Sequence, residues 1–381
     1  MSKPVYITKT AIFLPNEPVP NEELESYLGV VNGTPSKSID IVLRNNGIKT
    51  RYYALDKEGK ATHTNAQMTA LAVKGLFAED PEKIKDLELL ACGTSSPDQL
   101  LPSHGVMTHG WLPESDAIEV VSPSGVCCAG MHAFKYAYLA ITSGNVELAA
   151  ATGSERFSGT IVSNVFEEEA QKLTELKKNP VIAFEKDFLR WMLSDGAGAF
   201  LLSDKKNEEG LSLQVDWIEG VSYANTKDTC MYMGAEKLPD GTLKSYMDCS
   251  HQEIMSRSLF SIKQDIKLLS DNIIQLGGKK IVELFEKKGL TADDVDYFLP
   301  HISSEYFRPK IYEMMGQLGK TIPYEKWFIN LYKLGNVGAG SAYLMVHELF
   351  NSGKLKKGER ILLLVPESGR FSYMYAMLTV C

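Results

Sequence analysis

The chain contains two copies of one pattern, and this duplication restricts its fold more than any other feature. Segment 86–96, DLELLACGTSS, has an acidic start, an apolar run and a closing pair of serines. Segment 294–304, DVDYFLPHISS, repeats that order 208 positions later (304 minus 96), and the same offset takes Cys128 to Asn336. Repetition at a fixed spacing indicates a duplicated structural unit.

Each copy also continues in the same way. An apolar, small-residue stretch typical of a buried helix ends at Ser143-Gly144 in the first copy and at Ser352-Gly353 in the second. A further apolar stretch, typical of a strand, follows at 146–152 and at 360–366. We therefore predict two related α/β halves, each built from a sheet with helices.

The predicted boundary between the halves lies at 190/191. The first half, 1–190, ends in a charged stretch at about 157–190 that we interpret as an excursion carrying helices. The second half, 191–381, includes a polar, weakly patterned excursion at about 204–250.

Composition excludes several classes of protein. A net charge of −8 argues against non-specific nucleic-acid binding, and no run approaches the ~18 apolar residues of a membrane span. The first twenty residues lack the apolar core and cleavage site of a secretory signal. Six irregularly spaced cysteines give neither a disulfide framework nor a metal-binding pattern. The sequence thus predicts a cytoplasmic enzyme with reduced thiols and no metal.

The corresponding positions of the two copies carry the candidate chemistry. Cys128 and Asn336 each lie beside glycine at a predicted helix N-terminus, where the helix dipole lowers the pKa of a thiol. The alternative is that Cys127 and Cys128 are small buried residues. His301 follows an apolar strand and Pro300 in the second copy. If the halves pack about a pseudo-two-fold axis, His301, Asn336 and Cys128 converge as a nucleophile with two hydrogen-bond donors.

A glycine-rich run at 195–200, DGAGAF, is the remaining motif of interest. It lacks the lysine and the spacing of a phosphate-binding loop, so we interpret it as a place of close strand packing.

These motifs resemble one enzyme family. Cys128-Ala-Gly, Asp195-Gly-Ala-Gly-Ala, Pro300-His301 and Gly335-Asn336 occur in the order seen in β-ketoacyl-ACP synthase III enzymes of the thiolase fold, and the likeness spans essentially the whole chain. The resemblance implies an α/β fold of duplicated halves in a five-layer αβαβα arrangement.

The same resemblance implies roles for individual residues. Cys128 would be the acylated nucleophile, and Cys127 a packing residue. His301 and Asn336 would polarise the carbonyl of the second thioester. The backbone N–H groups of Cys128 and Gly369 would form the oxyanion hole.

Departures from the family pattern point to the acyl donor. Members that take acyl groups from CoA often have a tryptophan and an arginine where this chain has Ile41 and Asn45. We therefore expect delivery by an acyl carrier protein rather than by CoA, with no other cofactor than the phosphopantetheine that arrives with the substrate. Leu101 stands where short-chain enzymes have an aromatic residue, contributed across a homodimer, so the acyl pocket is expected to take a longer chain.

Two segments resemble a narrower branch, the ketosynthases that make dialkylresorcinols. These are 46–54, NGIKTRYYA, and 62–67, THTNAQ. This resemblance implies that two acyl thioesters, one of them β-keto, are joined and closed to a cyclohexanedione ring. Ring closure needs a base. Glu185 is the candidate, although an interface carboxylate is an equally good interpretation, and Glu305 is the reserve.

Three further expectations complete the sequence-based hypothesis. Arg308 and Lys310, just after the His301 loop, are candidates for a basic rim that docks the acidic carrier protein, and the family implies a homodimer. One alternative function is a conventional β-ketoacyl-ACP synthase III that condenses with malonyl-ACP and releases CO2. The other is a non-catalytic partner subunit that only sets chain length.

Overall fold

The computed structural model describes residues 2–33, 35–36, 38–165 and 188–381. Nine strands form one hydrogen-bonded sheet that divides into two parts. The first part has the order β5 (Glu119–Val121), β4 (Leu89–Thr94), β6 (Leu148–Glu155), β7 (Gly196–Ser203) and β1 (Tyr6–Phe13). The second has the order β13 (Tyr297–Pro300), β14 (Arg360–Glu367), β15 (Ser372–Val380) and β8 (Leu213–Ser222).

Strand pairing confirms the duplication. In the first part β4 runs parallel to β6, β6 antiparallel to β7, and β7 antiparallel to β1. The second part repeats this sequence of pairings with β13, β14, β15 and β8. A short pairing of β1 with β8 joins the two parts, and in it Tyr6 lies opposite Gln214 and Ile7 opposite Leu213.

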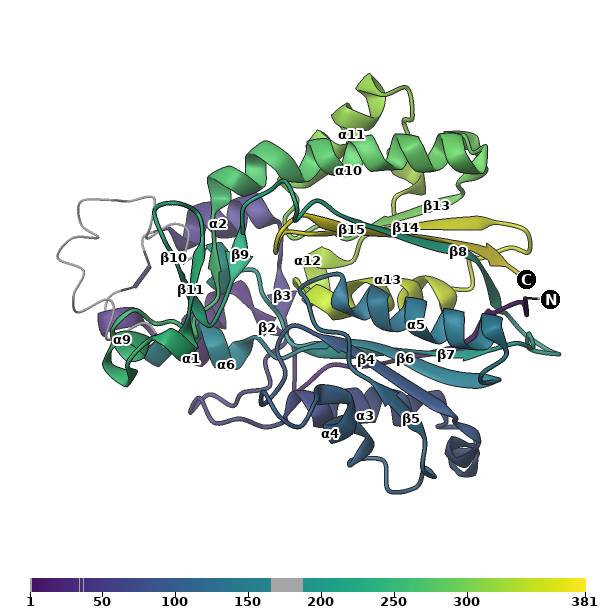
Figure 1. Cartoon of the computed structure of the whole chain (residues 1–381), viewed down its shortest axis with the longest axis horizontal. Coiled ribbons are helices and arrows are strands. Elements are labelled where there is room, and N and C mark those ends of the chain that lie inside the picture. Colours follow the sequence, from purple (N-terminus) through teal and green to yellow (C-terminus); the bar gives the residue numbers. More distant parts are fainter. Residues whose placement is uncertain (1, 34, 37, 166–187) are drawn as a thin grey trace.

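Helices and sheets alternate in five layers, as the resemblance predicted (Figure 1). The central layer holds α5 (Ala129–Ser143) and α13 (Ser341–Phe350), between the two parts of the sheet. One outer layer holds α3 (Asn65–Leu76) and α4 (His104–His109), and the other holds α10 (Ile266–Lys288) and α11 (Phe307–Gln317). Each sheet face is therefore covered, which explains why the strands are almost continuously buried.

Glycines allow the central helices to approach the sheet closely. A Cβ added at Gly130 or Gly153 would lie 2.2 or 2.1 Å from the carbonyl oxygen of Ala339, and one at Gly198 would lie 2.4 Å from Cβ of Tyr343. Gly198 belongs to the DGAGAF run, so that run serves close packing, as predicted. The ring of Tyr343 fills this space, and its hydroxyl donates a 2.8 Å hydrogen bond to the carbonyl of Gly130.

The predicted boundary at 190/191 is too early. Strand β7 lies after that boundary, yet it pairs with β6 and β1 and so completes the first part of the sheet. The second part begins with β8, inside the stretch 204–250 that sequence patterning had left as an excursion. The boundary between the two copies of the duplicated unit therefore lies between residues 203 and 213.

Helix α10 forms one wall of the site. The residues at its two ends and along its buried face explain why it forms. The side chain of Asp265 caps its N-terminus by accepting a hydrogen bond from the amide of Leu268, at 2.9 Å. Gly289 ends the helix in the left-handed region, at φ 63°. Leu269, Ile273 and Ile281 recur at helical spacing and are buried against the second part of the sheet.

Shorter elements surround the open end of the sheet. They are β2 (Val19–Pro20), β3 (Thr50–Arg51), β9 (Met231–Tyr232), β10 (Ala235–Lys237), β11 (Leu243–Ser245), β12 (Lys263–Gln264), α1 (Leu24–Leu28), α2 (Ile39–Asn46), α6 (Ser158–Ile161), α9 (His251–Ser256) and α12 (Leu331–Leu334). Within the predicted excursion 157–190 the structure describes α6 and the turn of helix at 188–190, while 166–187 lie outside the described residues. Among the helices that are described, none is long and apolar enough to cross a membrane.

Candidate active site

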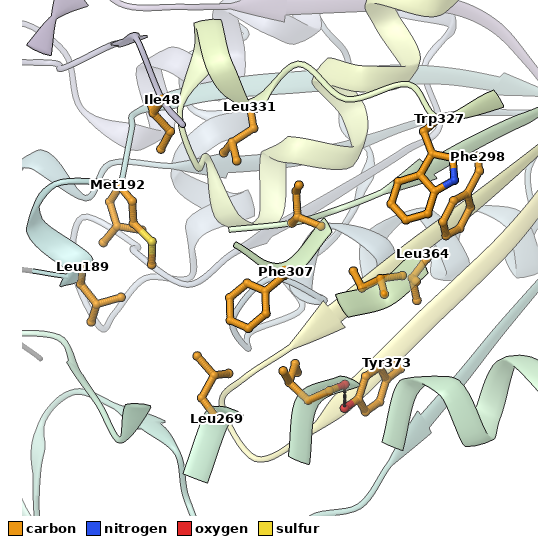
Figure 2. Packing of buried hydrophobic residues seen from close by; sticks show 14 of the residues in the cluster. Ile48, Leu189, Met192, Leu269, Phe298, Phe307, Trp327, Leu331, Leu364 and Tyr373 are labelled. Carbon is orange, nitrogen blue, oxygen red and sulfur yellow. Dashed lines mark hydrogen bonds between the residues drawn. The ribbon is translucent and has the colours of Figure 1, made fainter. Parts of the chain in front are cut away.

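A cavity opens between α10, α11 and the ends of β13, β14 and β15. Its total empty volume, including its mouth, is about 780 Å³. The polar side chains that line it are Cys127, Gln264, His301, Ser303, Asn336 and Ser368. The rest of the lining is almost entirely apolar, and Figure 2 shows three of these side chains, Leu269, Phe307 and Tyr373, which come from α10, α11 and β15. The cavity thus combines a small polar end with a long apolar wall, which suits a substrate with an alkyl chain.

His301 enters the cavity from the end of β13. Its amide donates a 2.7 Å hydrogen bond to the carbonyl of Leu364 on β14, and its side chain is buried. The loop that follows is fixed to the end of α2, because the hydroxyl of Ser304 and the amide of Glu305 donate to the carbonyls of Asn45 and Asn46. Burial lowers the pKa of His301 to about 4, so its imidazole is neutral at pH 7. A neutral imidazole offers one N–H donor and one free nitrogen.

Asn336 reaches the same cavity from the turn before α13. Its backbone is anchored on both sides, since its amide donates to Met192 and its carbonyl accepts from Ser194. Its side-chain oxygen accepts a 2.9 Å hydrogen bond from the amide of Gly338. This contact commits the oxygen, so the NH2 group of Asn336 is the part left to donate into the cavity.

The two adjacent cysteines occupy different surroundings. Cys127 lines the cavity together with His301 and Asn336. Cys128 is the N-cap residue of α5, and its thiol donates to the carbonyl of Val365 at 3.3 Å, within the packed layer between helix and sheet. The sequence predicted Cys128 as the nucleophile and Cys127 as a packing residue. Both cysteines belong to one buried hydrophobic cluster, and this assignment stays a prediction.

The pKa of the Cys127 and Cys128 thiols is raised, so the expectation of a lowered pKa is wrong. Burial raises the pKa of both thiols, and the nearby negative charge of Glu367 raises it further. The sequence argument counted the helix dipole and could not see the carboxyl group that lies at the same helix end. Both thiols are therefore protonated at rest, and a reaction must remove the proton.

Sequence reasoning missed two buried carboxyl groups, Glu155 and Glu367, which end β6 and β14. Glu155 accepts hydrogen bonds from the hydroxyls of Ser95 and Ser96, at 2.8 and 2.5 Å, and from the amide of Ala339, at 3.1 Å. Burial raises the pKa of Glu155 to about 7. The sequence did contain a signal for Glu155 and Glu367, because each is the last residue of an equivalent strand in the two copies.

Glu367 holds the segment in front of α5. One of its carboxyl oxygens, Oε2, accepts from the amides of Val126 and Cys128, both at 3.0 Å. The Cys128 amide would have to leave Glu367 in order to donate to an oxyanion, so the oxyanion role of this amide stays a prediction.

Gly369 lies in the turn after β14, beside the same segment. A Cβ at Gly369 would be 3.0 Å from Cγ2 of Val126, so the turn lies directly against the residue before Cys127. Among the residues that the structure describes, the Gly369 amide has no hydrogen-bond acceptor. The oxyanion role of this amide stays a prediction.

Several other predicted residues lie outside the cavity. Leu101 is 86% exposed on a loop of this single chain. Glu305 packs on Gly47 and pairs with Arg308 at 3.7 Å, and it does not line the cavity. Lys310 is exposed on α11 with its ammonium 4.2 Å from the ring of Tyr306. Glu185, the candidate base, lies outside the described residues.

Ile41 and Asn45, the positions used to argue about the acyl donor, both lie on the exposed face of α2. The C-terminal end of that helix holds the His301 loop, because the carbonyls of Asn45 and Asn46 accept hydrogen bonds from it. A metal role has no support in the described parts of the chain, where no group of three or more His, Cys, Asp or Glu side chains could hold an ion.

A second hollow lies on the other side of Met231, which lines both spaces. Its empty volume, including its mouth, is about 590 Å³. Ser95, Ser96, Gly125 and Val126 line it. Because Val126 precedes Cys127, the two hollows flank the same thiol-bearing segment.

Comparison with known proteins places this geometry in context. Residues 285–373, which include His301 and Asn336, match the family described as 3-oxoacyl-[acyl-carrier-protein (ACP)] synthase III C terminal. The chain is 24% identical over 363 residues to a β-ketoacyl-[acyl-carrier-protein] synthase III of Deinococcus radiodurans, covering 95% of this chain and 90% of that protein.

Solved structures share the whole architecture. OleA of Xanthomonas campestris, in its E117A form, superposes with a TM-score of 0.74 at 18% identity, over 100% of this chain and 99% of the other. AbyA1, a tetronic acid condensing enzyme, also gives 0.74 at 18% identity, over 98% of this chain and 99% of the other. These similarities extend over both halves and therefore cover both walls of the cavity.

Proposed function

We propose that the chain is a β-ketoacyl-ACP synthase III-like condensing enzyme of the thiolase superfamily and that it joins two acyl thioesters through an acyl-cysteine intermediate. The observation that carries this proposal is the shared cavity of Cys127, His301 and Asn336 at the end of an apolar wall. A thiol of the Cys127–Cys128 pair attacks the first thioester, and the chain so transferred lies along that wall.

His301 and Asn336 serve the second thioester. The N–H of the neutral imidazole and the NH2 group of Asn336 donate toward the carbonyl oxygen of that substrate. Both donors are fixed before substrate arrives, so they stabilise the negative charge that develops when the α-carbon becomes a nucleophile. The α-carbon loses a proton and attacks the acyl-cysteine carbonyl. The new carbon–carbon bond forms, the bond from that carbonyl carbon to the cysteine sulfur breaks, and the thiolate takes up a proton.

We propose further that the second substrate is a β-ketoacyl thioester and that the product closes to a cyclohexanedione precursor of dialkylresorcinols. Two hollows that meet at Met231 support this, because such a product carries two alkyl chains. The resemblance of 46–54 and 62–67 to that branch is the second support. Glu185 remains the proposed base for ring closure.

The proposed donor is an acyl carrier protein, and the proposed assembly is a homodimer. Ile41 and Asn45 provide neither the aromatic ring nor the cation that would hold a CoA nucleotide. Arg308 and Lys310 on the outer face of α11 are candidates for docking the acidic carrier. In a homodimer the exposed Leu101 would be available to the partner's acyl pocket.

A substrate comparison tests the proposal. The acylated protein is given either a β-ketoacyl carrier protein or malonyl carrier protein, and products are identified by mass spectrometry. We expect a condensed, cyclised product with the β-ketoacyl donor. Release of CO2 and a 3-oxoacyl product with malonyl carrier protein alone would instead support the conventional initiating synthase. Failure to form any acyl-enzyme would support the non-catalytic subunit.

A further inference from the structure

We propose that Gln264 selects the second substrate by its oxygen at C3, because it accepts a hydrogen bond from the hydroxyl of a 3-oxoacyl thioester in its enol form. This inference rests on the proposed condensing function and names a specificity-determining residue for it. The proposed mechanism uses His301, Asn336 and a cysteine. It leaves a second polar pair in the cavity lining, formed by Gln264 and Ser368, without a role.

Gln264 has a hydrogen-bond acceptor that the protein does not use. The side chain lines the cavity and is only 5% exposed. Its Nε2 donates to the hydroxyl of Ser368 at 2.9 Å, but its Oε1 is shielded from solvent and has no hydrogen-bond partner among the described residues. Buried polar atoms are nearly always paired, so an unpaired acceptor on a side chain that lines a substrate cavity indicates a donor on the substrate.

Ser368 supplies the complementary half of this site. Its hydroxyl accepts from Gln264 and donates to the sulfur of Met231, at 3.8 Å. A thioether sulfur is a weak acceptor, so the Ser368 proton can turn to a better one. A substrate oxygen that both donates and accepts would therefore find an acceptor in Oε1 of Gln264 and a donor in the hydroxyl of Ser368.

Backbone contacts hold the Gln264–Ser368 pair in place before substrate arrives. Gln264 on β12 lies opposite Met231 on β9 in an antiparallel pair. The amides of Cys230 and Met231 both donate to the carbonyl of Gly369, at 2.9 and 3.2 Å. Because Gly369 follows Ser368 in the chain, these contacts tie the two partners together, and substrate binding has little left to order.

The pair lies at the same end of the sheet as His301. Ser368 directly follows β14, and the amide of His301 donates to the carbonyl of Leu364 on that strand. Met231, which contacts the Ser368 hydroxyl, lines both hollows. A substrate that runs from His301 to the second hollow therefore passes this pair.

A 3-oxoacyl thioester carries an oxygen that suits the pair. Transfer of a proton from C2 to the C3 oxygen gives an enol, whose hydroxyl both donates and accepts. This exchange is an isomerisation, so it needs no further reactant. An unsubstituted acyl chain would leave Oε1 of Gln264 unpaired, and a site built to hydrogen-bond a hydroxyl rejects an analogue that lacks it.

The test measures the binding of three analogues that cannot transfer their acyl group, because CH2 replaces the thioester sulfur. They are derived from the 3-oxodecanoyl, 3-hydroxydecanoyl and unsubstituted decanoyl thioesters of N-acetylcysteamine, and calorimetry with the full chain gives their dissociation constants. Gln264→Leu removes the acceptor, and Gln264→Met, which keeps the length of the side chain, serves if Gln264→Leu fails to fold. Gln317→Leu, at an exposed position of α11, is the matched control. Condensation of the octanoyl-enzyme with the 3-oxodecanoyl thioester is measured in parallel.

We expect the unmodified protein and Gln317→Leu to bind the 3-oxo and 3-hydroxy analogues about 10-fold more tightly than the unsubstituted one, as one added hydrogen bond would do. In Gln264→Leu or Gln264→Met this preference should fall to about twofold or less, and kcat/KM for condensation should fall by a similar factor.

Three results would overturn the inference and leave the condensing function intact, as long as condensed product forms. They are equal binding of all three analogues by the unmodified protein, a preference for the 3-hydroxy analogue alone, and a preference that persists in folded Gln264→Leu. Absence of condensed product from the unmodified protein, with the preference present, would instead overturn the condensing function and retain the binding role of Gln264.

Discussion

Gly278 of α10 offers a direct way to change the length of acyl chain that the cavity accepts. A Cβ at this position would lie 2.2 Å from Sδ of Met314 on α11. Met314 lines the cavity, so its flexible side chain has open space on that side. Gly278→Ala should therefore push the Met314 sulfur into the cavity.

The size of the effect follows from this contact. The sulfur must retreat by about 1.3 Å before it reaches a normal separation of ~3.5 Å from the new methyl group. That distance removes room for about one methylene of the substrate, or two if the methionine terminus swings across the space. Each buried methylene contributes ~0.8 kcal/mol, which is about a fourfold change in binding. We expect kcat/KM for the longest chain that fits to fall by about 4- to 15-fold.

The assay is the competition of acyl donors of increasing chain length, read as the profile of acyl-enzyme masses. Shorter chains should be used as well as before, so the profile shifts by one or two carbons. Gly316→Ala on α11 is the matched control, because its Cβ would meet only Oγ1 of Thr321, at 3.6 Å, on the exposed side of the helix. An unchanged profile in Gly278→Ala, or the same shift in Gly316→Ala, would refute the assignment of this wall to the acyl chain.

Three other substitutions test the polar end of the site. His301→Ala should reduce condensation by about 100- to 1000-fold and leave the acyl-enzyme mass unchanged, because the ring donates to the second substrate only; single-turnover measurement of each half-reaction separates the two. Glu367→Gln keeps one oxygen for both amides and removes the charge that raises the pKa of Cys127, so alkylation by iodoacetamide should quicken and its pH profile should move to lower pH; an unmoved profile would contradict this electrostatic account. Glu155 has a folded-state pKa raised to about 7, so the stability it contributes is complete below its unfolded pKa of ~4.3 and is lost as pH rises through 7. Denaturant unfolding should show that the free energy of unfolding falls by about 3 kcal/mol between pH 5 and 8, and that this fall is missing in Glu155→Gln. An equal fall in both proteins would mean that another group causes it.

Much of this architecture was predictable because the chain repeats itself. The paired segments 86–96 and 294–304 became β4 and β13, and Cys128 and Asn336 both came to lie at the starts of the two central helices. Those placements follow from apolar runs and small residues, which local patterning reports well. The boundary near 190 was wrong because the composition of β7, GAGAFLLS, does not show which strands it pairs with, and its partners β6 and β1 place it in the first half.

The details of the site depend on the directions of the side chains, which the spacing of residues along the sequence does not predict. The Cys128 thiol donates to the carbonyl of Val365, which lies more than 230 residues away in sequence. The raised pKa of the Cys127 and Cys128 thiols has the same origin, because the charge of Glu367 comes from a strand of the other half. Long-range contacts of this kind produce no periodic pattern in the sequence around the cysteines.

The two buried carboxyl groups explain why the site lies at the junction of the halves. Glu155 ends a strand of the first half and holds the amide of Ala339, at the start of the second half's helix. Glu367 ends the equivalent strand of the second half and holds the amide of Cys128, at the start of the first half's helix. Each half therefore fixes the helix start of the other, by the same kind of contact. Because one of these helix starts presents a thiol and the other an amide side chain, a nucleophile and a donor can share one cavity only when both halves are folded together.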